Sequence, residues 1–480
     1  MTALRKALFA HGRVPALLML YVLVQPLLDA VTSLAAQAKL PLTPGTVVRM
    51  LFLAGIFCWL IFCRPYDGKK RVLAGTGLIT AYLAVFLAWS LYQGGMSLCA
   101  NNAAEAMKVF YTLYLVLFLY ALWQQRRFLL PMWVVGTCGA GYCGIILIAF
   151  LTGTSFASYN AGFGYSGWFY SANDVSNVIL LSAPVVLSLS LERMTGEKKT
   201  SRRAWGGMLL VLLSVVFSAA FLGTKLVYLG VFVYLAAALC WFAVRLLATK
   251  DRRFLRGVIA ALVLCAVLAA LYPISPLNDY MNEVFVPMSG EDEEAMAESL
   301  AIEGVKEADR AAKNAALEAA AEGTWLGELV KTNPLVGKIN WILSRRLLYI
   351  APILQEYLDG GWWIKLMGLG YGQTADYVRD IHQLVEMEPV MLLLRHGAVG
   401  LCLGFVPVLA AAVWLLISVL RKWRQCLCSL NCCSMLYSAA AALAACVIVG
   451  HVMQSPSVSI IAVSVWAQLL GTVCGKELQE

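Results

Sequence analysis

Twelve apolar runs, each about as long as a membrane is thick, constrain this chain more than any other feature. A helix needs about 20 apolar residues to cross a hydrocarbon core of ~30 Å. The sequence is 61% hydrophobic and only 14% charged, which excludes the water-soluble globular class. We therefore expect an all-α polytopic membrane protein. The runs lie at 14–36, 45–64, 71–93, 103–124, 128–152, 173–192, 206–223, 225–248, 257–274, 397–420, 434–455 and 457–475.

Short basic clusters between the runs predict the topology. Cytoplasmic connections of membrane proteins are enriched in Lys and Arg, and the clusters fall on alternate connections. This pattern places both termini in the cytoplasm and accounts for the net charge of +9 without a nucleic-acid partner. The first run lacks a clear cleavage site, so we read it as a retained span. The clusters are RPYDGKKR (64–71), QQRR (124–127), RMTGEKKTSRR (193–203), TKDRRFLR (249–256) and RKWRQ (421–425).

One long polar segment, 275–388, separates nine expected transmembrane helices in 1–274 from three in 389–480. Alternation of the spans makes this segment extracytoplasmic. Its first part, 279–322, holds twelve acidic and three basic residues and predicts a solvated, alanine-rich helical insert. Its second part, 325–388, is aromatic and amphipathic, and we expect it to be the functional half. No internal repeat is visible, which argues against an inverted-repeat transporter.

Ionisable residues at membrane depth are rare, so each one is a candidate functional residue unless an ion-pair partner accounts for its charge. Asp29 and Arg49 both fall in the outer halves of their spans, so an ion pair between the first two helices is the simplest interpretation. Lys108 and Lys225 lie near the outer ends of their spans. Both can reach the outer face, although snorkelling alone also explains them.

A helix running continuously over 389–420 would be about 48 Å long, more than the hydrocarbon core. The excess would project outward and place Arg395 and His396 at the outer interface. A polar stretch with many ionisable groups begins at Gly368 and runs directly into this expected membrane helix.

Five further polar residues lie near the expected outer ends of helices. A helix would put Arg379, His382 and Glu386 on one face, because they are three and four residues apart. Asn173 either caps the sixth span or binds sugar, and we favour the cap. His451 lies in an apolar run, where a packed core histidine is the simpler expectation.

Four sequence blocks, in order, resemble the O-antigen ligase and polymerase superfamily over most of residues 15–475; the acidic insert lies outside the resemblance. The resemblance implies a GT-C-like, metal-independent glycosyltransferase without cofactor, on the outer face of the bacterial cytoplasmic membrane. Such a protein moves a glycan from undecaprenyl pyrophosphate to a hydroxyl of a glycan or lipid acceptor. The blocks are GYSGWFYSANDVSNVILLSAP (164–184), FLGTKLVYLG (221–230), SRRLLYIAPILQEY (344–357) and MGLGYG…EMEPVMLLLRHGAVGLCLGF (367–405).

The chain departs from the pattern of Gram-negative ligases at three positions and looks more like members from Gram-positive-type bacteria. An arginine that is common near the Gly-x-Phe block of the family is absent, because Gly164 and Tyr165 stand there. Lys225 replaces another arginine, and Glu386 takes the place of the catalytic histidine. The resemblance thus implies Glu386 as the base, with His382 as the second choice because an unperturbed imidazole titrates near neutrality.

Transfer from a lipid pyrophosphate needs mainly charge neutralisation and positioning, which Arg and Lys provide. An alternative function is a flippase for lipid-linked oligosaccharide, but a flippase should carry charge at midplane depth, whereas these candidates gather at the outer boundary. A third reading is a peptidoglycan polymerase of the shape and division type, but the sequence shows none of the signature blocks of that class.

We expect no metal site. The residues expected to bind the pyrophosphate and the glycan are Arg345, Arg346, Lys225, Arg379, Lys108, Arg395 and Asn173.

Overall fold

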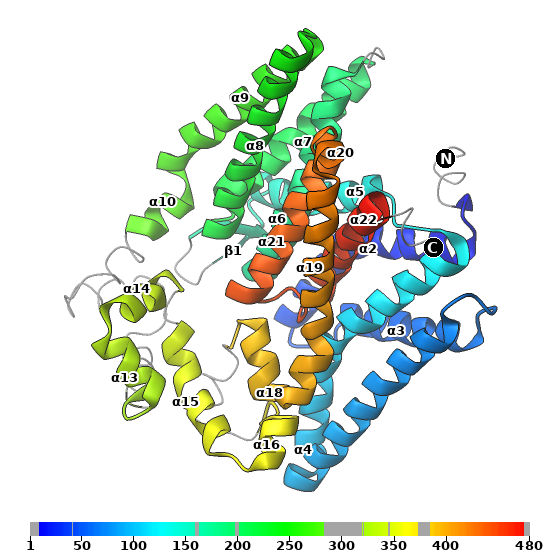
Figure 1. Cartoon of the computed structure of the whole chain (residues 1–480). Helices are drawn as coiled ribbons and strands as arrows, with labels where there is room; N and C mark the ends of the chain where they lie inside the picture. The colour runs from blue at the N-terminus through cyan, green and yellow to red at the C-terminus, as the bar shows by residue number, and fades with distance from the viewer. Residues whose placement is uncertain are drawn as a thin grey trace.

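The chain is an all-α polytopic membrane protein: a bundle of long helices with a smaller group of short helices at one end (Figure 1). The computed structural model describes residues 9–40, 42–158, 163–196, 201–282, 319, 321–343, 346–372 and 385–474. Most of the expected acidic insert, 279–322, lies outside the described residues.

Eleven helical stretches among the described residues are long and apolar enough to cross a membrane. Each of the twelve predicted runs falls largely within one of them, because one stretch contains two runs. They are α2 (Arg13–Gln37), α3 (Pro44–Phe62), α4 (Lys69–Arg126), α5 (Met132–Leu151), α6 (Ala172–Thr195), α7 (Arg202–Phe221), α8 (Lys225–Thr249), α9 (Arg253–Leu271), α18 (Glu388–Gly404) together with α19 (Val406–Arg421), α21 (Leu430–Ile448) and α22 (Pro456–Cys474).

The 58-residue α4 is two antiparallel segments that meet at a sharp turn. Gly95 adopts a φ of +70°, which only glycine adopts readily. The Asn102 amide donates to the Ser90 hydroxyl at 2.8 Å, and the Thr80 and Tyr114 hydroxyls lie 3.1 Å apart, as in a hairpin. Figure 1 shows the chain reversing at the bottom of α4. Two predicted spans therefore form this one element.

Short elements gather mostly at the end of the bundle that carries the α4 turn, which we call the site end. Side-chain caps start several of them, including Thr324 before α13 and Asn333 before α14. The strands pair in antiparallel fashion, with Phe156 opposite Gly167. These elements are β1 (Phe156–Ala157), β2 (Tyr165–Gly167), the 3₁₀ turn η1 (Tyr272–Ile274), α10 (Pro276–Tyr280), α13 (Trp325–Thr332), α14 (Pro334–Ile342), α15 (Arg346–Asp359) and α16 (Trp362–Met367); α20 (Trp423–Leu427) lies at the opposite end.

The expected continuous helix over 389–420 is wrong, because the chain breaks at Gly397 and again between α18 and α19. Gly397 has a φ of +67°, and a Cβ there would lie 2.3 Å from the carbonyl oxygen of Leu366. The backbone N–H groups of Leu369 and Gly370 donate to carbonyls of α18 at 2.8 and 3.0 Å. The break therefore lets the segment after α16 pack directly against α18.

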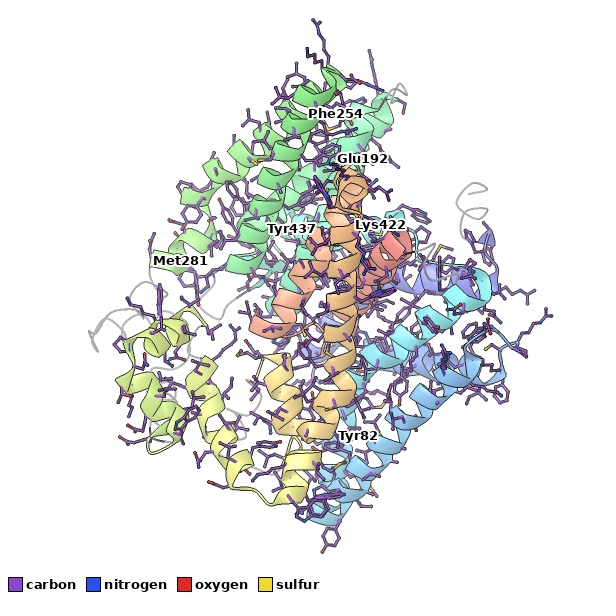
Figure 2. All side chains as sticks on the ribbon, viewed as in Figure 1. Tyr82, Glu192, Phe254, Met281, Lys422 and Tyr437 are labelled. Carbon is purple, nitrogen blue, oxygen red and sulfur yellow. The ribbon has the colours of Figure 1, made fainter. Side chains whose placement is uncertain are left out.

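Arg395 and His396 are buried side chains of this contact and do not lie at an open interface. Arg395 is 1% exposed, donates to the carbonyl of Gly370 at 2.8 Å and lies over the ring of Tyr371. The His396 ring nitrogens lie 2.9 Å from the Tyr371 hydroxyl and 3.2 Å from that of Tyr82, which Figure 2 labels near the site end. The contacts of both residues hold α16 and α4 to α18.

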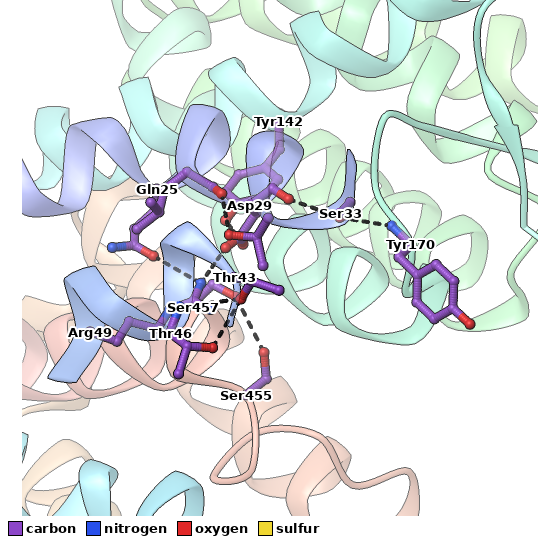
Figure 3. Close-up of polar contacts among 12 residues, drawn as sticks. Gln25, Asp29, Ser33, Thr43, Thr46, Arg49, Tyr142, Tyr170, Ser455 and Ser457 are labelled. Atoms are coloured by element: carbon purple, nitrogen blue, oxygen red, sulfur yellow. Dashed lines mark hydrogen bonds and ion pairs between the residues drawn. The ribbon is translucent and has the colours of Figure 1, made fainter. Parts of the chain in front are cut away.

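The expected ion pair between Asp29 and Arg49 is confirmed (Figure 3). Arg49 also donates to the Gln25 side chain at 3.4 Å, and the Tyr142 hydroxyl donates to Asp29. The network thereby joins α2, α3 and α5. The hydroxyl of Ser33, one turn along α2, accepts from a backbone N–H in the segment that leads into α6 (Figure 3). It therefore anchors the entry to α6 beside the same helices.

We predict that Arg49→Met lowers the thermal midpoint of the purified protein, because Asp29 keeps its charge and loses its cation. The double variant Asp29→Asn, Arg49→Met should recover part of the loss, since it removes both charges. Melting in detergent measures both effects, and Arg253→Met, in an exposed pair with Asp251, is the control. A single variant as stable as the wild type would contradict the assignment.

Candidate functional site

Five ionisable residues from five separate segments meet at the site end. Asp174 lies in the first turn of α6, Lys225 is the first residue of α8, and Arg346 is the first residue of α15. Glu386 directly precedes the N-cap of α18, and His451 lies in the linker between α21 and α22. Two carboxylates and three cationic side chains thus gather near helix N-termini.

Arg346 and Glu386 form the central ion pair of this cluster. Arg346 Nε donates to Glu386 Oε2 at 2.7 Å, and Nη2 donates to the same oxygen. The side chains are 17% and 15% exposed, so the pair is largely shielded from water. Burial would raise the pKa of Glu386, but the contact with His451 and the charge of Arg346 outweigh burial and lower it. Glu386 is therefore an ionised anchor for two cations.

His451 lies between two carboxylates. Its Nδ1 is 3.3 Å from Asp174 Oδ1, and its Nε2 is 3.6 Å from Glu386 Oε1. Burial alone would lower the pKa of His451, but the two carboxylates outweigh burial and raise it to about 10. The imidazole is therefore a cation at neutral pH, and the alternating charges form a chain from Asp174 through His451 and Glu386 to Arg346.

The linker that carries His451 is not helical, contrary to the expected span over 434–455, because α21 ends at Ile448. Gly450 has a φ of +82°, and a Cβ there would lie 1.7 Å from the carbonyl oxygen of Glu386. His451 itself has a φ of +62°, an uncommon value for a residue with a side chain. The expectation that His451 lies on an apolar helix is therefore wrong, and its partners are two carboxylates.

Buried polar side chains from three helices hold the linker in place. The Asn177 amide donates to the carbonyl of Gly450 at 3.0 Å. Glu388 accepts from the backbone N–H groups of Met453 and Gln454 at 2.5 and 3.2 Å. The Thr112 hydroxyl donates to the carbonyl of Met453 at 3.1 Å. These contacts satisfy backbone groups that a short linker would leave unpaired, and they fix the position of His451.

Lys225 completes the cationic side of the cluster. Its charge lies within interaction range of Arg346, and its Nζ lies 5.9 Å from the centre of the Tyr280 ring. The structure thus brings together three residues predicted from the sequence: Lys225, Arg346 and Glu386.

The other predicted site residues lie elsewhere or outside the described residues. Lys108 forms a surface ion pair with Glu105 at 2.6 Å, and Arg395 is buried against Gly370. The expected cap of α6 is corrected: the Ser171 side chain accepts from the N–H of Asp174, and Asn173 lies within the helix. Arg345, Arg379 and His382 fall outside the described residues.

Sequence reasoning missed Asp174 and His451. Asp174 was passed over in favour of the neighbouring Asn173, although an acid in the first turn of a helix is exposed to its positive end. A usable signal for His451 was present, because Gly450 and Pro456 mark a helix end and the next helix start. The pairing itself could not be foreseen, since Asp174 and His451 are 277 positions apart in the sequence.

We predict that His451→Gln destabilises the protein in a pH-dependent way. The raised pKa means that the folded state keeps the proton more strongly than the unfolded chain, so the stabilisation is full below about 6.5 and is lost as pH rises through about 10. The difference in melting temperature between wild type and variant should shrink over that range. A difference that stays constant from pH 6 to pH 10 would contradict this account.

Comparison with family models identifies one match, described as "O-antigen ligase like membrane protein", over residues 12–474. No curated protein and no solved structure matched the chain. The match includes every residue of the cluster and all eleven candidate spans. This chain belongs to the O-antigen ligase like family of membrane proteins.

Proposed function

We propose that the protein transfers a glycan from undecaprenyl pyrophosphate to a hydroxyl group of an acceptor glycan or lipid. The site end faces the outside of the bacterial cytoplasmic membrane, and both termini are cytoplasmic. The family supports a membrane glycan ligase or polymerase. The observation that carries the choice of donor is the convergence of Lys225 and Arg346 at two helix N-termini.

A cation at a helix N-terminus is opposed by the helix dipole, so its placement needs a reason. Here Lys225 begins α8 and Arg346 begins α15, and their charges repel each other. A bound pyrophosphate would add negative charge beside the two cations and accept hydrogen bonds at the helix N-termini. The same contacts stabilise the charge that develops on the leaving group, so no metal is needed.

Buried polar atoms near the linker also favour a polar ligand. Asn177 Oδ1 and Gln454 Nε2 are shielded from water and have no hydrogen-bond partner among the described residues. Buried polar atoms in native structures normally have one. Sugar hydroxyl groups can donate and accept, so a glycan suits such a site.

An apolar cavity of about 300 Å³ borders the linker. Its walls come from α4, α19, α21 and α22, including Val116, Trp414 and Trp466, and one part is formed by Val452 and Met453. Met453 lies two residues from His451. A polyprenyl chain in this cavity would bring its pyrophosphate to the site end, which supports a lipid-linked donor over a soluble one.

We predict that Glu386→Gln abolishes transfer while the protein remains in the membrane at wild-type level. The neutral side chain keeps the shape but no longer fixes the charges of Arg346 and His451. Purified protein is incubated with undecaprenyl-pyrophosphate glycan, and release of undecaprenyl pyrophosphate is followed.

The matched control is Glu105→Gln, which breaks the surface pair with Lys108 and should leave transfer unchanged. Wild-type protein that moves the intact lipid-linked glycan across vesicles without releasing the carrier would replace this proposal with the flippase. Full transfer by Glu386→Gln would show that transfer does not need the charge of Glu386.

A further inference from the structure

Asp174 differs from Glu386 in how its carboxylate is engaged. Its Oδ1 is shielded from water and lies 3.3 Å from His451 Nδ1. The side chain as a whole is nevertheless 34% exposed, more than twice the 15% of Glu386. Oδ2 is therefore the oxygen of Asp174 that can meet a substrate.

Both oxygens of Glu386 face cations. Arg346 donates twice to Oε2, and His451 Nε2 lies 3.6 Å from Oε1. A proton added to Glu386 would have to displace one of these contacts. Its lowered pKa has the same origin and makes it a weak proton acceptor. The carboxylate that fixes the cations is thus poorly suited to catalyse proton transfer.

The linker geometry gives His451 a fixed position between the two acids. Asn177, Glu388 and Thr112 bind its flanking backbone, and all three side chains are buried. The imidazole is protonated at neutral pH, so it has no lone pair free to accept a proton. Its contact with Oδ1 orients Asp174, and none of the described residues binds Oδ2.

We propose that Asp174 is the catalytic base that accepts the proton of the acceptor hydroxyl, with His451 as the residue that positions it. The inference rests on the proposed function. The acceptor oxygen bonds to the anomeric carbon as its proton passes to Asp174 Oδ2. The bond from that carbon to the phosphate oxygen breaks, and its electron pair leaves with the pyrophosphate, beside Lys225 and Arg346. The protonated Asp174 then releases its proton to water.

The test compares Asp174→Asn with wild type in purified protein, using undecaprenyl-pyrophosphate glycan and an acceptor. Asparagine keeps the size of the side chain but cannot accept a proton. We expect a fall in transfer rate of about 10²-fold or more, the usual contribution of a general base. Donor affinity, measured as the Kd for undecaprenyl-pyrophosphate glycan without acceptor, should change less than about threefold. Asp174→Glu should restore part of the rate.

The control is Glu192→Gln, which alters a half-buried acid at the opposite end of α6, where it accepts from Asn431 at 2.5 Å. Figure 2 shows Glu192 far from the site end. The Glu192→Gln variant should transfer glycan at the wild-type rate.

Two results would overturn the inference: transfer by Asp174→Asn within about threefold of wild type, or a loss of donor binding that matches its loss of rate. If the proposed function itself is wrong, wild-type protein will release no undecaprenyl pyrophosphate. That result distinguishes failure of the proposed function from failure of the Asp174 assignment.

Discussion

The ion pair between Arg346 and Glu386 is the interaction on which the site depends. It joins the first residue of α15 to the segment that enters α18, 40 residues further along the chain (386 − 346). Without Glu386, Arg346 and His451 would lose the carboxylate that both of them contact. Partly buried charges of one sign are costly unless counter-charges lie close by. The pair therefore lets the protein keep cations concentrated at the site end.

A rigid linker complements this pair. Residues 450–454 contribute one side chain to the cluster, yet buried groups of α4, α6 and α18 bind their backbone. The left-handed conformation of His451 is unfavourable in isolation, and such strain persists only where the surroundings fix it. The close approach of Gly450 to Glu386 explains why a glycine is needed there. These contacts place His451 between Asp174 and Glu386 without the freedom that a flexible loop would have.

Hydropathy and charge predicted the membrane class, the positions of the spans and the Asp29–Arg49 pair, because these depend on composition over a single span or on neighbouring spans. Lys225, Arg346 and Glu386 came from motif blocks. The break at Gly397 was missed because it depends on contact with Leu366, which no periodicity reveals. His451 was missed because an apolar run does not show where a helix ends inside it.

We propose that Lys225 and Arg346 bind the pyrophosphate of a lipid-linked glycan, with Asp174 at the sugar. A cryo-electron microscopy structure with a non-transferable undecaprenyl-pyrophosphate glycan analogue tests it most directly. The account predicts phosphate oxygens within hydrogen-bond distance of both cations and the anomeric carbon on the side of Asp174. A pyrophosphate bound away from Arg346, or a sugar turned away from Asp174, would contradict it.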